Sequence, residues 1–141
     1  MKSLLVKSST LLLALVLLFG LVACHTAPKE GLWESATYRK DTTLGKGGTT
    51  LVVEVAAGDE VITFTVMTDK ETVGAALLEN GLIAGKEGDF GLYIKVVNGI
   101  TADYDVDKSY WGFYSNGEYM MTGVDGTAIE GGETFELVYE K

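Results

Sequence analysis

The chain has 141 residues, with 20 Asp or Glu against 11 Lys or Arg, so its formal net charge is −9. Such an acidic surface disfavours nucleic acids and anionic membrane surfaces as partners. The only cysteine and the only histidine are the neighbours Cys24 and His25. Because both precede the predicted folded region, a zinc site or a Cys/His nucleophile is excluded from that region.

The first 23 residues have the three-part layout of a secretory signal peptide. Lys2 and Lys7 precede an apolar run from Leu11 to Phe19, which is about half the length of roughly 20 residues that a membrane-spanning helix needs. The four residues that end at Cys24 resemble the bacterial lipobox, in which cleavage leaves an acylated cysteine as the new N-terminus. The sequence therefore predicts lipidation of Cys24; the alternative is an ordinary secretory signal that is cut elsewhere.

Cleavage before Cys24 removes two lysines and leaves 9 basic against 20 acidic residues, a net charge of −11. Residues 24–35 are then a lipidated tether, with the only proline of the chain, and residues 36–141 form one domain. The predicted location is extracytoplasmic, with the lipid anchor holding the domain at the cell membrane.

The first part of the domain reads as β structure. Residues 33–38 are expected to form a first strand. Leu51, Val53 and Val55 alternate with other residues and share one face, and residues 61–67 alternate in the same way after the turn at residues 57–59. These two segments predict an antiparallel hairpin.

One short helix is expected over residues 69–80. Thr68 and Glu71 have the spacing of a capping box, and Gly81 fits the position after the helix end. Val73, Ala76 and Leu77 follow helical spacing and predict the face that packs on the sheet.

The rest of the chain again reads as strands and turns. Asn-Gly pairs at residues 98–99 and 116–117 are typical of tight turns, and residues 45–48 and 131–132 are glycine-rich turns without the spacing of a phosphate-binding loop. The strands expected here are residues 91–97, 110–114, 119–121 and 134–139. The sequence predicts an α+β fold, a β-grasp-like mixed sheet with one short helix. A generic α+β sandwich and an all-β fold are the alternatives.

Four segments carry a resemblance to a known family: residues 91–100, 110–114, 121–124 and 132–139. Together they resemble the C-terminal domain of transcobalamin and intrinsic factor, and above all bacterial lipoproteins of that family, whose domain is otherwise of unknown function. The resemblance covers residues 36–141.

This resemblance implies a β-grasp-type domain that contacts cobalamin in the vertebrate carriers. In bacteria it implies a lipoprotein that is sometimes associated with energy-coupling-factor vitamin transporters. The chain has no counterpart of the helical barrel domain that supplies much of the corrinoid site in the carriers. A separate half-site of this kind is expected to bind weakly unless a partner completes it.

Aromatic residues are dense between Tyr110 and Tyr119. On a strand, Trp111 and Phe113 face one way and Tyr110 and Tyr114 face the other, so one set fills the core and the other could offer a flat platform to a macrocycle or a sugar ring. The resemblance places this strand and the loop at residues 123–124 on the ligand side. The expected ligand-binding residues are Tyr93, Asn98, Tyr110, Trp111, Tyr114, Gly123 and Val124.

Asp103, Asp105 and Asp107 begin like a calcium-binding loop. Lys108 and Tyr114 stand where such a loop has glycine and glutamate, so we expect a solvated acidic loop and no metal. No pair of carboxylates is marked out for catalysis, and we expect a non-enzyme without a cofactor.

The leading hypothesis is a lipid-anchored binding module that captures a small corrinoid-like ligand, such as cobalamin, for a membrane transporter. The alternative is a surface module that binds a protein or a polysaccharide without a small-molecule pocket. A calcium-stabilised adhesin is a third reading.

Overall fold

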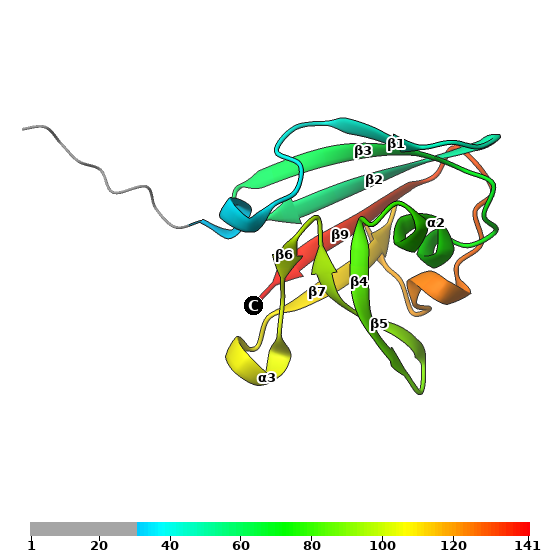
Figure 1. The fold of residues 1–141 in the computed structure, drawn as a ribbon. Helices are drawn as coiled ribbons and strands as arrows, with labels where there is room; N and C mark the ends of the chain where they lie inside the picture. Colours follow the sequence, from blue (N-terminus) through cyan, green and yellow to red (C-terminus); the bar gives the residue numbers. More distant parts are fainter. Residues whose placement is uncertain (1–30) are drawn as a thin grey trace, which may run out of the picture. The chain divides into compact units, whose positions relative to one another are not determined.

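The computed structural model describes residues 31–141, a unit with a hydrophobic core of its own (Figure 1). The predicted signal peptide, Cys24, His25 and the first part of the tether lie outside the described residues. The described part is a mixed α+β fold that consists mostly of sheet and contains a short helix, as the sequence predicts.

The larger sheet has six strands in the order β1-β3-β2-β9-β7-β8. β2 lies parallel to β9 and β1 lies parallel to β3, whereas the other neighbours are antiparallel. The strands are β1 (Thr42–Gly45), β2 (Thr49–Ala57), β3 (Glu60–Thr68), β7 (Tyr110–Ser115), β8 (Glu118–Tyr119) and β9 (Thr134–Glu140).

A second sheet of three strands lies in front of the first in Figure 1, beside the helix α2 (Val73–Glu79). It is antiparallel throughout and consists of β4 (Ile83–Gly88), β5 (Gly91–Val97) and β6 (Ile100–Thr101). Three short helical turns complete the unit: η1 (Leu32–Ser35), α3 (Tyr104–Asp107) and η2 (Val124–Gly126). The single mixed sheet expected from the sequence is therefore wrong in one respect, because the strands divide between two sheets.

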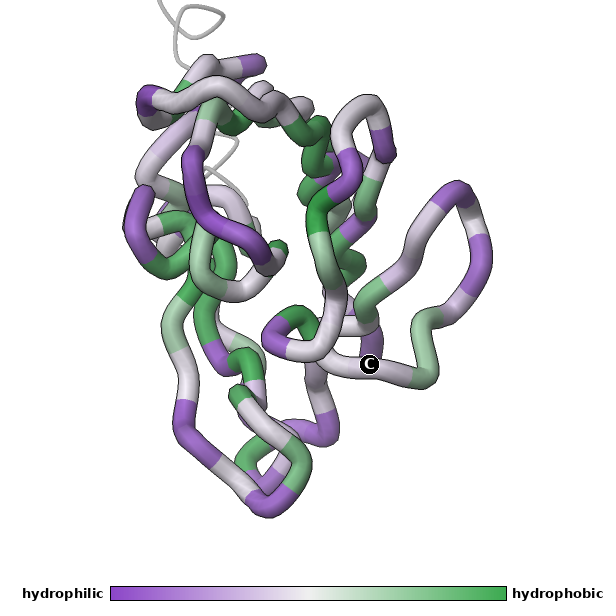
Figure 2. Tube along the Cα trace, turned by 90° about the vertical axis from the view of Figure 1, so that its right-hand side faces the viewer, coloured by the Kyte–Doolittle hydropathy of each residue, from purple (hydrophilic) through white to green (hydrophobic). Residues whose placement is uncertain are grey.

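The hairpin of β2 and β3 confirms the first strong prediction. Leu51 pairs with Val66, Val53 with Phe64 and Val55 with Ile62, so all six side chains lie on the same face of the sheet. They are buried in the core, whereas the residues between them are partly or fully exposed. Figure 2 shows hydrophilic residues at several turns of the chain and hydrophobic stretches between them.

The helix is shorter than predicted and has a different N-cap. Thr72, not Thr68, caps it, since its Oγ1 accepts a hydrogen bond from the backbone N–H of Ala75 at 3.2 Å. Thr68 instead ends β3 as a fully buried residue, and its hydroxyl accepts from the backbone N–H of Lys70. The predicted end is right, because Gly81 adopts a φ of +66° directly after the helix.

Two segments differ from the expected strands. Residues 33–38 are not a strand. The 3-10 turn η1 extends over their first part and ends at Ser35, and the Trp33 Nε1 donates to the carbonyl of Ala57 at 2.8 Å. β4 was not expected, because all its residues after Ile83 are exposed. They are an alanine, two glycines and two charged residues, without alternation. The sequence signal for a strand depends on a buried face, and β4 has almost none.

Candidate functional site

A cleft with a volume of about 410 Å³ lies where β5 of the smaller sheet faces β7 and β8 of the larger one. The segment from Met120 to Val124 forms one of its walls. Among the described residues that line it, none carries a charged side chain. They are Phe90, Leu92, Tyr93, Ile94, Tyr104, Tyr110, Trp111, Phe113, Tyr119, Met120, Met121, Thr122, Gly123 and Val124.

The alternation of β7 supplies the floor of the cleft. Trp111 and Phe113 point towards the core and are each 8% exposed, which confirms that this pair, rather than the tyrosines, fills the core. The Phe113 ring stacks on Phe135 with 5.6 Å between centroids, and the Trp111 ring meets Tyr139 edge-on at 5.5 Å. The same two side chains therefore belong both to the core and to the cleft.

The rim of the cleft consists of exposed apolar and aromatic side chains. Phe90, at the turn between β4 and β5, is 99% exposed, and Met121 is 93% exposed. Six of the eleven large apolar or aromatic side chains exposed on the described unit line this cleft, so they form a concentrated patch rather than scattered surface residues. The six are Phe90, Tyr93, Tyr104, Tyr110, Tyr119 and Met121.

Asp125 holds the wall of the cleft in place. Its Oδ2 accepts a hydrogen bond from the backbone N–H of Leu92 at 2.8 Å and so ties η2 to β5. The other carboxylate oxygen lies against Gly74 of α2, where an added Cβ would stand only 2.4 Å from it. Val124, next to Asp125, is buried and helps to anchor the wall in the core.

The structure brings five of the seven expected ligand-binding residues to this cleft: Tyr93, Tyr110, Trp111, Gly123 and Val124. Asn98 and Tyr114 do not line it. Asn98 is 1% exposed, and its side chain makes two hydrogen bonds to the backbone of Tyr38. Its Oδ1 accepts from the N–H of Tyr38 at 2.9 Å, and its Nδ2 donates to the carbonyl of Tyr38 at 2.8 Å. It joins the N-terminal segment to the turn after β5. The lipidation site Cys24 lies outside the described residues.

Sequence reasoning missed Phe90, Met121 and the tyrosines at 104 and 119 as parts of the site. Phe90 could be placed only once β4 and its turn into β5 were known, and no periodic signal marks that strand. Tyr104 comes from α3, which the sequence presents as an acidic loop.

Tyr114 lies in a tyrosine and carboxylate group on the other face of β7. Its hydroxyl donates to the Glu140 carboxylate, and its ring meets Tyr119 edge-on. The hydrogen bond to Glu140 raises the pKa of Tyr114 to about 12, and the same carboxylate also raises the pKa of Tyr110. Gly112 leaves the room for this arrangement, since a Cβ there would lie 2.8 Å from the Tyr114 ring.

The acidic segment of residues 103–107 forms α3 and its N-cap rather than a loop. Asp103 accepts from the backbone N–H of Asp105 and pairs with Lys95 at 3.3 Å, and the hydrogen bond from Lys95 lowers its pKa. Asp107 accepts from Ser109 and pairs with Lys141 at 3.0 Å; these bonds, led by that from Ser109, lower its pKa to about 2. The carboxylates are thus held by separate partners.

Over residues 31–141 the structure contains no group of three His, Cys, Asp or Glu side chains close enough to hold a metal ion. In the same part of the chain no helix has both the length and the apolar character to cross a membrane.

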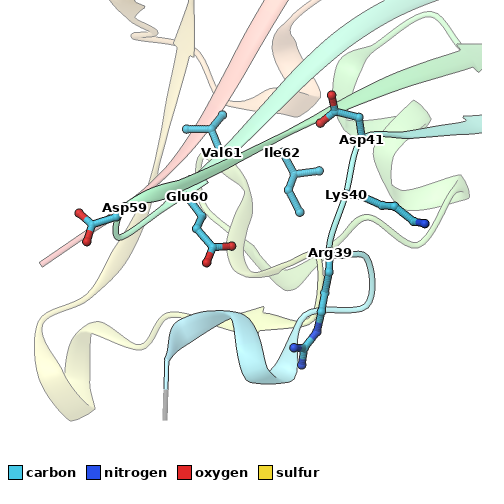
Figure 3. Close-up of a pocket in the computed structure, with 7 residues that line it drawn as sticks. All are labelled: Arg39, Lys40, Asp41, Asp59, Glu60, Val61 and Ile62. Atoms are coloured by element: carbon cyan, nitrogen blue, oxygen red, sulfur yellow. The ribbon is translucent and has the colours of Figure 1, made fainter. Parts of the chain in front are cut away.

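A second, wider hollow of about 680 Å³ lies beside the turn between β2 and β3. Figure 3 shows that its charged side chains, among them Arg39, Lys40 and Asp59, point in different directions around Ile62. The Arg39 guanidinium is used within the unit, where it donates to the Glu34 carbonyl at 2.9 Å. These groups do not converge on one point, so the aromatic cleft is the better candidate site.

Comparisons with known proteins agree with this fold. Residues 70–141 match a family described as Domain of unknown function (DUF4430). The chain belongs to this family. A crystal structure of a candidate metal-binding protein from Ruminococcus gnavus is similar to 67% of the chain and to 98% of that protein, with 32% sequence identity and a TM-score of 0.63.

The crystal structure of haptocorrin in complex with Cbi is also similar. The match covers 66% of this chain but only 25% of haptocorrin, with 22% identity and a TM-score of 0.54, and it shows a transcobalamin-like fold for this DUF4430 domain. A comparison with curated proteins gives no match.

Proposed function

We propose that this DUF4430 protein is a membrane-anchored, extracytoplasmic lipoprotein that binds a small ligand in the aromatic cleft and is not an enzyme. The observation that carries the proposal is the cleft itself, which gathers six exposed apolar or aromatic side chains and has no charged lining among the described residues. Binding sites for small molecules are typically concave, mainly apolar and furnished with a few polar groups. The four tyrosine hydroxyls and Thr122 supply such groups here.

The ligand that we favour is a corrinoid such as cobalamin. The support is the fold shared with haptocorrin, together with the mainly aromatic lining of the cleft of about 410 Å³. We also propose the β-grasp assignment, supported by the β2–β3 hairpin, the helix α2 after it and the parallel pair of β2 with β9.

The matched part is a quarter of haptocorrin, so the cleft is proposed as half of a site. The predicted anchor at Cys24 would keep the domain within reach of membrane proteins, and a transporter is the partner that we propose to complete it. One half-site alone buries only part of a macrocycle, so its affinity should be low.

A surface module for proteins or polysaccharides is the second candidate. It requires that the tyrosine face of β7 be open and flat. Tyr114 lies outside the cleft, but it is half-buried and its ring meets Tyr119 edge-on. Tyr110 borders the cleft. The geometry at Tyr110 therefore favours the small ligand.

The test is a titration of the domain, residues 31–141, with cobinamide and cobalamin. The Trp33→Phe variant leaves Trp111 as the only tryptophan, at the cleft floor, so its fluorescence reports on the site. The Trp111→Phe variant keeps only Trp33, which does not line the cleft, and corrects for light absorbed by the corrinoid. A saturable change confined to Trp111, confirmed by calorimetry, is expected. No heat and no change up to millimolar ligand, with or without the transporter, would contradict corrinoid binding.

The anchor is tested separately. Expression of the full chain and of Cys24→Ala in a bacterium fed a labelled fatty acid should label only the native sequence and place it in the membrane fraction. Equal labelling of both would refute lipidation at Cys24.

A further inference from the structure

The outer face of β7 and β9 holds a carboxylate that is not paired with a basic side chain. Glu140 stands opposite Tyr110 in the strand pair and accepts a hydrogen bond from the Tyr114 hydroxyl. Three ion pairs are found within the part of the chain that the structure describes, and Glu140 belongs to none of them. Its neighbour Lys141 pairs with Asp107 instead, at 3.0 Å. The charge of Glu140 is therefore held by tyrosine and not by an opposite charge of the described unit.

Tyrosine rings surround this carboxylate. The Tyr114 ring and the Glu140 carboxylate both lie over Gly112, where a Cβ would stand 2.8 Å from the ring and 3.3 Å from the carboxylate. Tyr119 meets the Tyr114 ring edge-on with 5.4 Å between centroids and is 60% exposed, and Tyr110 is exposed as well. Glu140 raises the pKa of Tyr114 to about 12 and also raises that of Tyr110, so its negative potential reaches both hydroxyls. We call these three tyrosines and the carboxylate the Glu140 group.

A group of this composition attracts organic cations. The face of a tyrosine ring is negative and stabilises a cation within about 6 Å of its centroid, and quaternary ammonium ions are the typical ligands of such aromatic sites. The chain contains an example of this contact close by, since the Lys108 ammonium lies over the Tyr104 ring at 4.7 Å from its centroid. The formal net charge of −9 adds a long-range attraction for cations. An anion is repelled by the same carboxylate.

We propose that the Glu140 group binds a quaternary ammonium group, of the trimethylammonium type, at the margin of the aromatic cleft. Tyr110 and Tyr119 also line the cleft, so the cation site adjoins it. The inference goes beyond the proposed function, because it assigns a site on the outer face of β7 and holds whatever occupies the cleft. The recognised group has two sources, a free compound such as choline and the headgroup of phosphatidylcholine.

Choline and its neutral carbon analogue test the proposal on the domain. In the analogue a tert-butyl group replaces the trimethylammonium group, so the two compounds share their shape and differ in charge. Calorimetry should show that the native domain binds choline about tenfold or more tightly than the analogue, as expected for contact with two rings and a carboxylate. Choline should shift the ring signals of the three tyrosines in NMR spectra, and an equal concentration of sodium chloride should not. Equal binding of the two compounds, no binding of choline, or equal shifts with sodium chloride would overturn the inference.

Two glutamates of β9 give a matched pair of variants. Glu140→Gln keeps the size of the side chain and an oxygen for the Tyr114 hydroxyl but removes the charge, so the preference for choline should fall by about threefold or more. Glu136 lies on the same face of β9, opposite Tyr114, and accepts from the backbone N–H of Gly117 at 2.8 Å. Glu136→Gln removes an equal charge and should keep the native preference. Tyr119→Leu, which removes an exposed ring, should weaken choline binding in a domain that stays folded by circular dichroism. An unchanged preference in Glu140→Gln, or an equal loss in both glutamate variants, would overturn the inference.

Sedimentation with phosphatidylcholine vesicles separates the two sources of the group. The domain without its lipid anchor should bind these vesicles if the headgroup is the ligand, and should bind choline alone if the ligand is a free compound; either result supports the cation site. Failure of this inference also differs from failure of the proposed function. If cobinamide binds and choline does not, the proposed function stands and the cation site is refuted. If choline binds and cobinamide does not, the cation site stands and corrinoid binding is refuted.

Discussion

Replacement of Asn98 by alanine should destabilise the domain without changing the affinity of the cleft. Both polar ends of the buried side chain bond the backbone of Tyr38, at 2.9 and 2.8 Å, and alanine removes both bonds. Each hydrogen bond contributes about 0.5–1.5 kcal/mol net, so the loss should be about 1–3 kcal/mol. A left-handed backbone, here with a φ of 51°, adds about 1 kcal/mol for a residue other than Asn or Gly.

Asn116 offers a matched control. It has a φ of 49° in the turn between β7 and β8 and is exposed, and within residues 31–141 no hydrogen bond of its side chain is found. Asn116→Ala should therefore show only the backbone cost, and the difference between the two variants isolates the two buried hydrogen bonds.

Urea unfolding followed by circular dichroism should place Asn98→Ala about 1–3 kcal/mol below Asn116→Ala. For a domain of this size the melting temperature should differ by about 4–12 °C. Ligand titration of the folded variants should give the same affinity for both. Equal stability of the two variants would refute the structural role of Asn98. A loss of affinity in Asn98→Ala alone would show instead that Asn98 contributes to ligand binding.

Three further outcomes are expected. Gly74→Ala should destabilise the domain by about 1–3 kcal/mol although alanine favours helices, because its Cβ would stand 2.4 Å from the Asp125 carboxylate. Thermal unfolding should show a smaller loss of stability when the same change is made in the Asp125→Gly variant. If the effects of the two changes simply add, the contact between the Cβ and the carboxylate is contradicted. Glu140→Gln should lower the pKa of Tyr114 from about 12 towards 10.0 in a spectrophotometric titration. The native domain should lose stability as the pH rises through that range, because the tyrosine ionises at a lower pH in the unfolded chain than in the folded domain. The pKa of Asp107 is lowered from 3.8 to about 2. Its contribution to stability is therefore present above that window and is lost as the pH falls through it. Asp107→Asn should flatten this part of the acid-unfolding curve, and an unchanged curve would argue against the bonds that Asp107 makes with Ser109 and Lys141.

The alternating segments of the sequence predict the structure well, because their pattern reports burial directly. Val53 and Phe64 both lie on the buried face of the β2–β3 hairpin as expected, and Trp111 and Phe113 enter the core together. Hydrophobic residues at every second position indicate a strand in a sheet with one buried face, because successive side chains of a strand point to opposite faces. It gives no information on which strands pair beyond the hairpins, so the division into two sheets could not be predicted.

The errors have local causes. Thr68 and Thr72 are both followed by residues compatible with the start of a helix, so either could be its N-cap. Thr68 still belongs to β3, which ends there, and this leaves Thr72 as the N-cap. β4 is an exposed strand without a hydrophobic face, so it left no pattern to read. Asn98 was assigned to the ligand with the segment that resembles the transcobalamin family. Its two backbone bonds instead join it to Tyr38, sixty positions away in the sequence.

The cleft follows from the way the two sheets meet. Trp111 and Phe113 project from β7 because alternate residues of a strand share a face. The adjacent strand β9 covers only the sides of these two rings, through Tyr139 and Phe135. The remainder is covered by β5, which is tied to the larger sheet through η2 and Asp125 rather than by strand pairing. A contact held by side chains leaves a gap that a continuous sheet would close, and the aromatic residues of the core then become the floor of a binding site. Because the same rings serve both purposes, a ligand that packs on them should also raise the free energy of unfolding, in proportion to the logarithm of its concentration above the dissociation constant.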